Sequence, residues 1–119
     1  MSDQGEEAND YRIQMDRTME PVISRNMACF QFEIPFMIWT SDTFKEKHPK
    51  ITDMIKNAVN RPYMIDDVPH LLMDLSGIQC KWFDPTRSVI NDKFNVNRKR
   101  FLRNGEDYDK IMTFPEIQN

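Results

Sequence analysis

Residues 29 to 39 read Cys-Phe-Gln-Phe-Glu-Ile-Pro-Phe-Met-Ile-Trp, and this stretch decides the fold class that the sequence predicts. Apolar and polar residues alternate from Phe30 to Ile34, and residues 36 to 39 are all apolar. Such a pattern is typical of a strand that enters a sheet covered on both faces. Pro35 cannot donate to a strand ladder, so we expect pairing to begin after it, with residues 36 to 40 as a buried central strand.

Two amphipathic helices are expected after this strand. Ser41-Asp42-Thr43 is a helix start, because Thr43 and Glu46 have the spacing of a capping box, and Pro49 should end or kink the first turn. The first amphipathic helix then continues to about Asn60. Its apolar residues recur at helical spacing, at Ile51, Met54, Ile55, Ala58 and Val59.

The second amphipathic helix begins at Asp66 or Asp67, since either side chain can cap it, and Gly77 suits its C-terminal end. Its apolar stripe consists of Val68, Leu71, Leu72 and Leu75. Residues 78 to 83 are expected to form a short edge strand, and residues 84 to 87 a turn. The expected fold is therefore α/β, with one strong buried strand and two amphipathic helices.

Composition narrows the possible functions. The chain has 119 residues, enough for one domain at most, and its net charge of -3 argues against nucleic-acid binding, which needs a basic surface. Cys29 and Cys80 lack the spacing of a zinc site or of a disulfide framework. No run of residues approaches a membrane span or a signal peptide, so the chain as written is expected to be cytoplasmic.

Five motifs, taken in order, resemble those of a known enzyme family. Ser2-Asp3-Gln4-Gly5-Glu6 is similar to a Ser-Asp-His-Gly-Glu metal motif, and residues 34 to 42 to a Val-Pro-Phe-hydrophobic-Trp-x-Ser-Asp strand. Residues 44 to 49 look like the lysine-rich helix that follows it. Residues 66 to 78 resemble an Asp-Asp-Leu-x-His-x-Leu-x-x-Leu-Ala-Gly-Ile helix, and residues 84 to 88 an Asp-Pro-Ser-Arg-Ser turn. Together they resemble the C-terminal part of a bacterial phosphoethanolamine transferase, in the sulfatase-like branch of the alkaline phosphatase superfamily.

The resemblance implies the C-terminal portion of a sulfatase-like α/β domain at residues 28 to 103, preceded by a polar arm at 1 to 27 and followed by a tail at 104 to 119. Enzymes of this family are anchored in the inner membrane and carry a periplasmic catalytic domain. They transfer phosphoethanolamine from a phospholipid donor to lipid A or another envelope glycan.

Zinc is the cofactor that the resemblance implies. In the family the metal is held by a glutamate, a nucleophilic threonine and the Asp-His pair of the first motif, and it lowers the pKa of the threonine hydroxyl. Asp3 matches the aspartate ligand, but Gln4 stands where the histidine belongs, and an amide is a poor zinc ligand. No residue matches the threonine or the glutamate, so no catalytic residue is assigned and tight zinc binding is not expected.

The sequence therefore predicts a truncated remnant of a phosphoethanolamine transferase, inactive alone, which self-associates through the open sheet edge at residues 36 to 39. The alternative is a small noncatalytic protein-interaction module, and a nucleic-acid binder is a weaker third reading. His70 is interpreted as a structural histidine rather than a catalytic base. The basic run at residues 98 to 103 is interpreted as a solvated face, although it could also touch phosphate.

Overall fold

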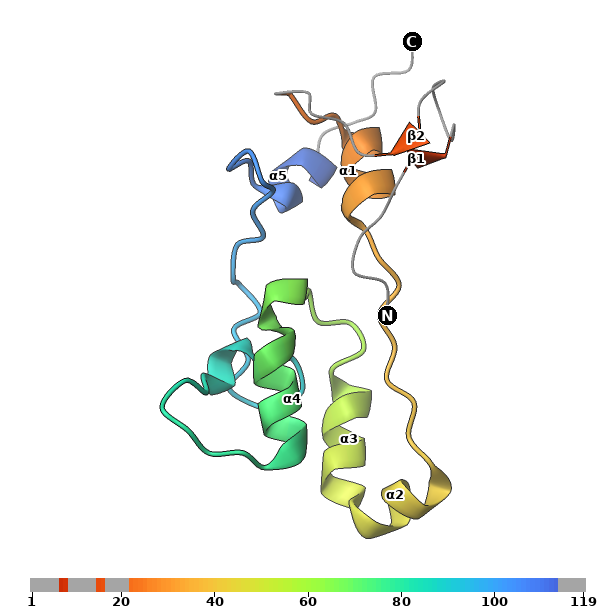
Figure 1. Ribbon diagram of the computed structural model, residues 1–119, viewed down its shortest axis with the longest axis vertical. Helices are drawn as coiled ribbons and strands as arrows, with labels where there is room; N and C mark the ends of the chain where they lie inside the picture. Colours follow the sequence, from red (N-terminus) through yellow and green to blue (C-terminus); the bar gives the residue numbers. More distant parts are fainter. Residues whose placement is uncertain (1–6, 9–14, 17–21, 114–119) are drawn as a thin grey trace. The chain divides into compact units, whose positions relative to one another are not determined.

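The computed structural model describes residues 7–8, 15–16 and 22–113, and it divides the chain into two compact units. Unit 1 contains the described residues up to Met37 and those from Lys99 onward, whereas unit 2 runs from Ile38 to Arg98. Figure 1 shows that helices dominate both units. The two units are described separately below.

The predicted α/β fold with a strong buried strand is wrong. Helix α1 (Arg25–Phe32) takes up the first part of the supposed strand, and residues 33 to 40 are extended without a ladder to any described residue. Met37 and Trp39, expected inside a sheet, are 74% and 84% exposed. The expected self-association through a sheet edge loses its basis, because this segment forms no sheet.

The alternation that suggested a strand is too short to separate the two periodicities. Ser24 caps α1 by accepting a hydrogen bond of 3.3 Å from the amide of Met27, and this local signal favours the helix. Met27, Ala28 and Gln31 then lie on one buried face of α1, whereas Phe30 is 37% exposed. The apolar side chains of the alternating stretch from Phe30 to Ile34 therefore do not lie on a single face.

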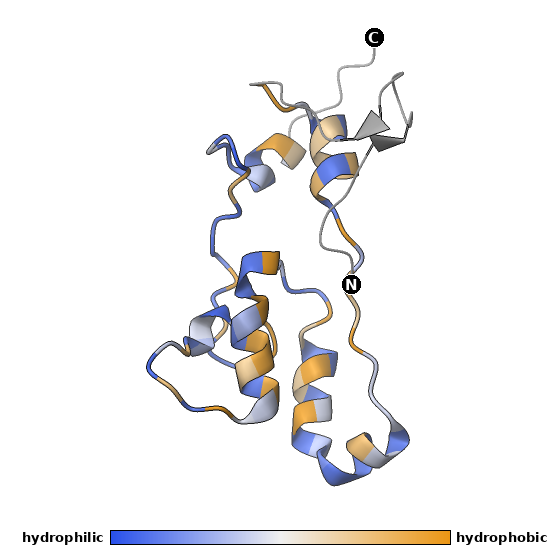
Figure 2. Ribbon diagram, viewed as in Figure 1, coloured by the Kyte–Doolittle hydropathy of each residue, from blue (hydrophilic) through white to orange (hydrophobic). Residues whose placement is uncertain are grey.

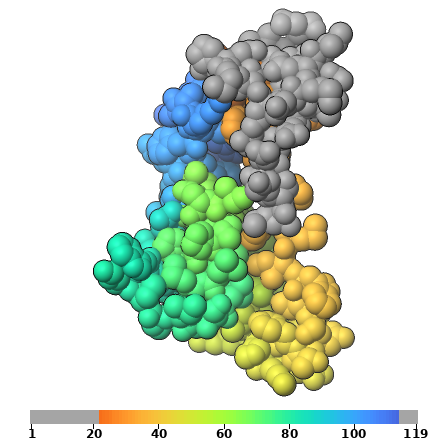
Figure 3. Space-filling model, in the orientation of Figure 1, coloured from red at the N-terminus to blue at the C-terminus, as the bar shows by residue number. Residues whose placement is uncertain are grey.

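Strand pairing in the described residues is limited to two places, both in unit 1. Strands β1 (Glu7–Ala8) and β2 (Met15–Asp16) pair antiparallel, with Glu7 opposite Asp16. An isolated bridge joins Phe101 to Asp107 and closes a short hairpin. The edge strand expected at residues 78 to 83 is also wrong, because this segment is a loop at the side of unit 2 (Figures 1 and 3).

Unit 1 is built around helices α1 and α5 (Tyr108–Thr113), which pack against each other. Its buried core consists of Ile23, Met27, Ala28 and Leu102, and Phe32, Tyr108, Ile111 and Met112 pack against it. Tyr108 also donates a hydrogen bond from its hydroxyl to the carboxylate of Glu33. The core therefore joins segments that lie far apart in the sequence.

Unit 2 begins with two helices that meet at a proline. Helix α2 (Asp42–Lys47) is capped by Ser41, which accepts a hydrogen bond of 3.1 Å from the amide of Phe44, and not by Thr43 as the capping-box spacing predicted. Helix α3 (Pro49–Asn57) has Pro49 in its first turn, so the predicted break at this proline is confirmed. Figure 2 shows the mixture of apolar and polar residues that makes α3 amphipathic.

The second amphipathic helix is also confirmed. A 3₁₀ turn, η1 (Ile65–Asp67), leads into α4 (Val68–Ser76), and Gly77 ends the helix with a left-handed φ of 68°. The amide of Ile78 then donates to the carbonyl of Met73 at 2.9 Å, which satisfies one of the last carbonyls of the helix. A second 3₁₀ turn, η2 (Pro85–Arg87), follows the loop and packs against α4.

The core of unit 2 lies between α3, α4 and the segment that follows η2. It consists of Ala58, Leu71, Val89, Ile90 and Phe94, with Ile38, Met54, Ile55, Tyr63 and Leu75 packed around it. Several large apolar side chains nevertheless remain exposed, among them Trp39, Val59, Leu72 and Trp82. None of the described helices has the length and apolar character needed to cross a bilayer.

Candidate functional site

The most highly organised polar cluster in the described residues lies along one face of α4. Asp67, His70 and Asp74 are spaced three and four residues apart, which places them on the same side of the helix. Asp67 is 2% exposed and His70 8%, and polar groups buried to this extent need partners. All three find them in residues 84 to 98, and we call this set of contacts the α4 clamp.

Asp67 is held by two arginines. One carboxylate oxygen accepts a hydrogen bond of 2.6 Å from Nε of Arg87, and the other accepts one from Arg98. The neighbouring Asp66 accepts a further bond of 3.1 Å from Arg98 and lies 3.7 Å from Arg87. Two carboxylates thus face two guanidinium groups, so the buried charge of Asp67 is balanced within the cluster.

His70 holds the start of η2. Its Nδ1 accepts a hydrogen bond of 3.0 Å from the backbone amide of Asp84, which requires the ring to carry its proton on Nε2. The imidazole is therefore engaged as a neutral acceptor inside the unit. This contact supports the structural interpretation of His70.

Asp84 itself organises the turn that His70 holds. One oxygen of its carboxylate accepts bonds of 2.7 Å from the hydroxyl of Thr86 and 2.9 Å from the amide of Thr86. These bonds, the hydroxyl first and the amide second, lower the pKa of Asp84 below its ordinary value. The turn is thus tied both to α4 and within itself.

Asp74 completes the clamp at the far end of the helix. Its Oδ2 accepts hydrogen bonds of 2.7 Å from the hydroxyl of Ser88 and 3.0 Å from Nδ2 of the Asn91 side chain. Arg61 fixes the same segment from the other side, because its Nη1 donates to the carbonyls of Val89 and Asn91 at 2.7 and 2.8 Å. Residues 88 to 91 are therefore held between two polar anchors.

This arrangement is suited to holding a backbone in place. The carboxylates of Asp67 and Asp74 already accept bonds from fixed donors, and Ser88 is fully buried, so its hydroxyl has no direct access to a substrate. Among the described residues no group of three or more His, Cys, Asp or Glu side chains could hold a metal ion. Asp3, the expected metal ligand, and Gln4 both lie outside the described residues.

The remaining residues considered from the sequence lie elsewhere. His48 sits at the junction of α2 and α3, with its ring 4.8 Å from that of Phe44. Cys29 belongs to α1, and Cys80 is an exposed thiol in the loop after α4. Within unit 2, neither His48 nor Cys80 takes part in the hydrogen bonds of the α4 clamp.

The α4 clamp joins two of the motifs that carried the family resemblance. Residues 66 to 78 supply Asp67, His70 and Asp74, and residues 84 to 88 supply their partners Asp84, Arg87 and Ser88. Sequence reasoning noticed both motifs without foreseeing that they bond to each other. It also missed Arg61 and Asn91, and it interpreted Arg98 as part of a solvated basic run, whereas Arg98 bonds Asp67 and Asp66.

Comparisons with known proteins agree with these motifs. The chain is 35% identical over 96 residues to phosphoethanolamine transferase EptC from Escherichia coli strain K12, and equally to EptC from strain RS218. It is 33% identical over 96 residues to phosphoethanolamine transferase CptA from Salmonella typhimurium. No family model and no solved structure matches the chain.

In each case the similarity covers 78% of this chain, whereas the chain spans only 15% of the length of the relative. The resemblance drawn from the motifs is thereby confirmed at the level of a partial match. The chain is a partial homologue of the phosphoethanolamine transferases.

Proposed function

We propose that this chain contributes the C-terminal part of a catalytic domain that transfers phosphoethanolamine from a phospholipid to lipid A or another envelope glycan. Within such an enzyme, anchored in the inner membrane with its catalytic domain in the periplasm, the role of unit 2 is to support the fold. The observation that carries this proposal is the α4 clamp, in which two motifs shared with the transferases are bonded to each other.

The physical argument for a supporting role rests on burial. A group that takes part in phosphoryl transfer has to reach the substrate or the metal. Asp67, His70 and Ser88 instead lie inside unit 2, where they bind one another's segments. The resemblance of these two motifs to those of the transferases is therefore explained by the geometry of the turn that they hold.

Zinc chemistry is proposed for the whole enzyme, with Asp3 as one ligand. The 119-residue polypeptide should bind zinc weakly, because Gln4 stands at the histidine position of the motif and offers a poor ligand. The same reasoning leads us to expect no transfer activity from this polypeptide alone. Turnover of a chromogenic phosphodiester in the presence of zinc that is abolished by Asp3→Ala would contradict this expectation.

A chimera tests the supporting role directly. Residues 38 to 98 would replace the matching segment of EptC from E. coli K12, and we expect the chimera to retain phosphoethanolamine transfer. The same chimera with Arg87→Gln should lose both folded protein and activity, whereas Lys93→Gln, on an exposed lysine outside the clamp, should change neither. A folded Arg87→Gln chimera without activity would instead show that Arg87 acts in the chemistry.

The second candidate is a noncatalytic protein-interaction module. It is favoured by the exposed indole rings of Trp39 and Trp82, which are 84% and 73% accessible to solvent. A chimera that folds and remains inactive, together with saturable binding of another protein through these rings, would favour the module.

A further inference from the structure

Helix α4 differs from the neighbouring helix α3 in the residues that it turns toward solvent. The exposed side of α3 carries Lys50, Asp53 and Lys56, as expected for a helix at the surface of a protein. Among the nine residues of α4, only His70 and Asp74 are ionisable, and both are engaged in the α4 clamp. The exposed side of α4 therefore carries no charged residue of the helix.

Apolar and small residues occupy that side instead. Pro69, Leu72 and Ser76 recur at helical spacing, and all three are exposed. Leu72 is 55% exposed, whereas Leu71 on the core side of the same helix is 2% exposed. A helix with apolar residues on both sides is typical of a protein interior. Helix α4 thus has the composition of an interior helix, although one of its sides is exposed.

The loop that follows α4 adds two further apolar side chains, because Ile78 and Trp82 are 52% and 73% exposed. This loop is held against the end of the helix. The amide of Ile78 donates to the carbonyl of Met73 at 2.9 Å, and the thiol of Cys80 lies 3.6 Å from the sulfur of Met73. We call Leu72, Ile78 and Trp82 the outer face of α4.

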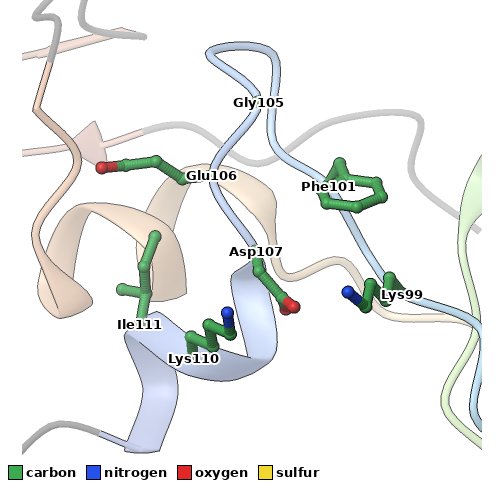
Figure 4. A pocket seen from close by; sticks show the side chains of 7 residues that line it. All are labelled: Lys99, Phe101, Gly105, Glu106, Asp107, Lys110 and Ile111. Carbon is green, nitrogen blue, oxygen red and sulfur yellow. The ribbon is translucent and has the colours of Figure 1, made fainter.

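The pocket in unit 1 gives no comparable indication of what binds there. Figure 4 shows it between the hairpin that follows Lys99 and helix α5. Two lysines, Lys99 and Lys110, and two carboxylates, those of Glu106 and Asp107, line it. Charge therefore selects neither an anion nor a cation in this pocket, whereas the outer face of α4 has one consistent, apolar character.

We propose that the outer face of α4 packs against the part of a phosphoethanolamine transferase that this chain does not span. This partner rests on the proposed function and specifies what unit 2 contacts. The chain spans 15% of the length of EptC and of CptA, so most of such an enzyme is available to cover the face. Helix α4 also belongs to one of the motifs that resemble the transferases, and its interior composition is satisfied once a second apolar surface covers it.

The partner surface should itself be apolar, because Leu72, Ile78 and Trp82 offer it no hydrogen-bonding group except the indole N–H. A charge lies beside the face, since the ammonium of Lys81 is 4.7 Å from the centre of the Trp82 ring. An apolar centre with a polar rim is the usual composition of a packed protein interface.

Cys80 reports whether the face is covered, because its exposed thiol lies in the same loop as Ile78 and Trp82. Modification of Cys80 by a maleimide would be followed by peptide mass spectrometry in the 119-residue chain and in the EptC chimera that carries residues 38 to 98, in the same detergent. Cys80 should react about tenfold or more slowly in the chimera, because only transient openings would expose it. Lys56→Cys, on the exposed side of α3, is the control and should react equally fast in both proteins.

A carboxylate placed on the face gives a second test, which does not need the chimera to fold. EptC without its matching 96 residues would be co-expressed with the 119-residue chain, and the two should co-purify. Leu72→Glu should abolish co-purification, because the contact would bury an unpaired charge, whereas Lys56→Glu should not. Both variants should keep the urea midpoint of the 119-residue chain, since both positions are exposed in it.

Three outcomes would overturn the proposal. They are equal reactivity of Cys80 in a folded chimera and in the 119-residue chain, co-purification that survives Leu72→Glu, and no co-purification with the wild-type chain. Protection of Cys80 in the 119-residue chain alone, rising with its concentration, would overturn it in favour of a second copy. A folded, inactive chimera with a protected Cys80 would contradict the proposed transfer function and support the contact.

Discussion

The carboxylate of Asp67 accepts a hydrogen bond of 2.6 Å from Nε of Arg87, a residue twenty positions further along the chain. The two partners differ sharply in burial, because Asp67 is 2% exposed whereas the side chain of Arg87 is 32% exposed. The buried carboxylate of Asp67 therefore needs the arginines to balance its charge, whereas the more exposed arginines can be solvated by water without it. This asymmetry makes the pair suitable for mutation.

Asp67→Asn should destabilise unit 2 by about 2 to 3 kcal/mol, less than the loss of a fully buried ion pair, because both arginines can turn toward water. Asp66→Asn is the matched control, since its half-exposed carboxylate faces the same two arginines, and it should cost less than about 1 kcal/mol. Urea unfolding followed by circular dichroism measures both. Equal losses from the two variants would contradict the assigned role of Asp67.

Unit 2 should keep its stability only when His70 is replaced by a residue that also accepts a hydrogen bond at the position of Nδ1. Asn can place an amide oxygen where Nδ1 lies, so His70→Asn should preserve the bond to the amide of Asp84, whereas His70→Leu should destabilise the unit by about 1 to 2 kcal/mol more. Hydrogen exchange at the amide of Asp84 reports the bond directly. Equal protection of this amide in both variants would refute the contact.

Gly77 ends α4 with a left-handed backbone, and a Cβ at this position would meet no atom within 4 Å. Gly77→Ala should therefore cost about 1 kcal/mol through backbone strain alone. Gly77→Asn should cost less, because asparagine tolerates this conformation. Denaturant melts of the two variants give the comparison, and a neutral alanine variant would show that the helix ends differently.

Tyr63 should give unit 2 an alkaline limit. Burial, followed by the charges of Asp67 and Asp66, raises the pKa of Tyr63 above its ordinary value. The neutral phenol is thus favoured in the folded state, so its stabilising effect is complete below about pH 10 and is lost as the pH rises from there through the folded pKa. Tyr63→Phe should flatten the fall in the urea midpoint above about pH 10. A fall of unchanged steepness would contradict the raised pKa.

The parts of the fold that depend on local signals could be predicted. The break at Pro49, the helix α4 and its end at Gly77 each arise from a few neighbouring residues, and the structure has all three. The predicted stripe of α4 is confirmed only in part, because Leu71 is buried whereas Leu72 is 55% exposed. The supposed strand at residues 36 to 40 was wrong because a strand is completed by a partner, which a run of apolar residues does not reveal.

The α4 clamp shows the same difference between local signals, which could be predicted, and long-range contacts, which could not. Asp66 or Asp67 was predicted as the helix cap. Asp67 does occupy the capping position, yet its carboxylate makes no cap bond and accepts bonds from Arg87 and Arg98 instead. These partners are twenty and thirty-one residues away, so no local pattern announces them. Tertiary packing decides whether Asp67 caps the helix or joins a buried ion pair. Local sequence patterns do not reveal that packing.

Unit 1 is assembled from segments on both sides of unit 2, since Ile23, Met27 and Ala28 share their core with Leu102. During synthesis on the ribosome, α1 therefore has to wait for the chain to emerge as far as α5 before it can bury its apolar face. Unit 2 can fold earlier, because its core contains only side chains from residues 38 to 94. We expect unit 2 to form first and to shorten the loop that unit 1 must close, so that early folding in the middle of the chain brings its two outer segments together.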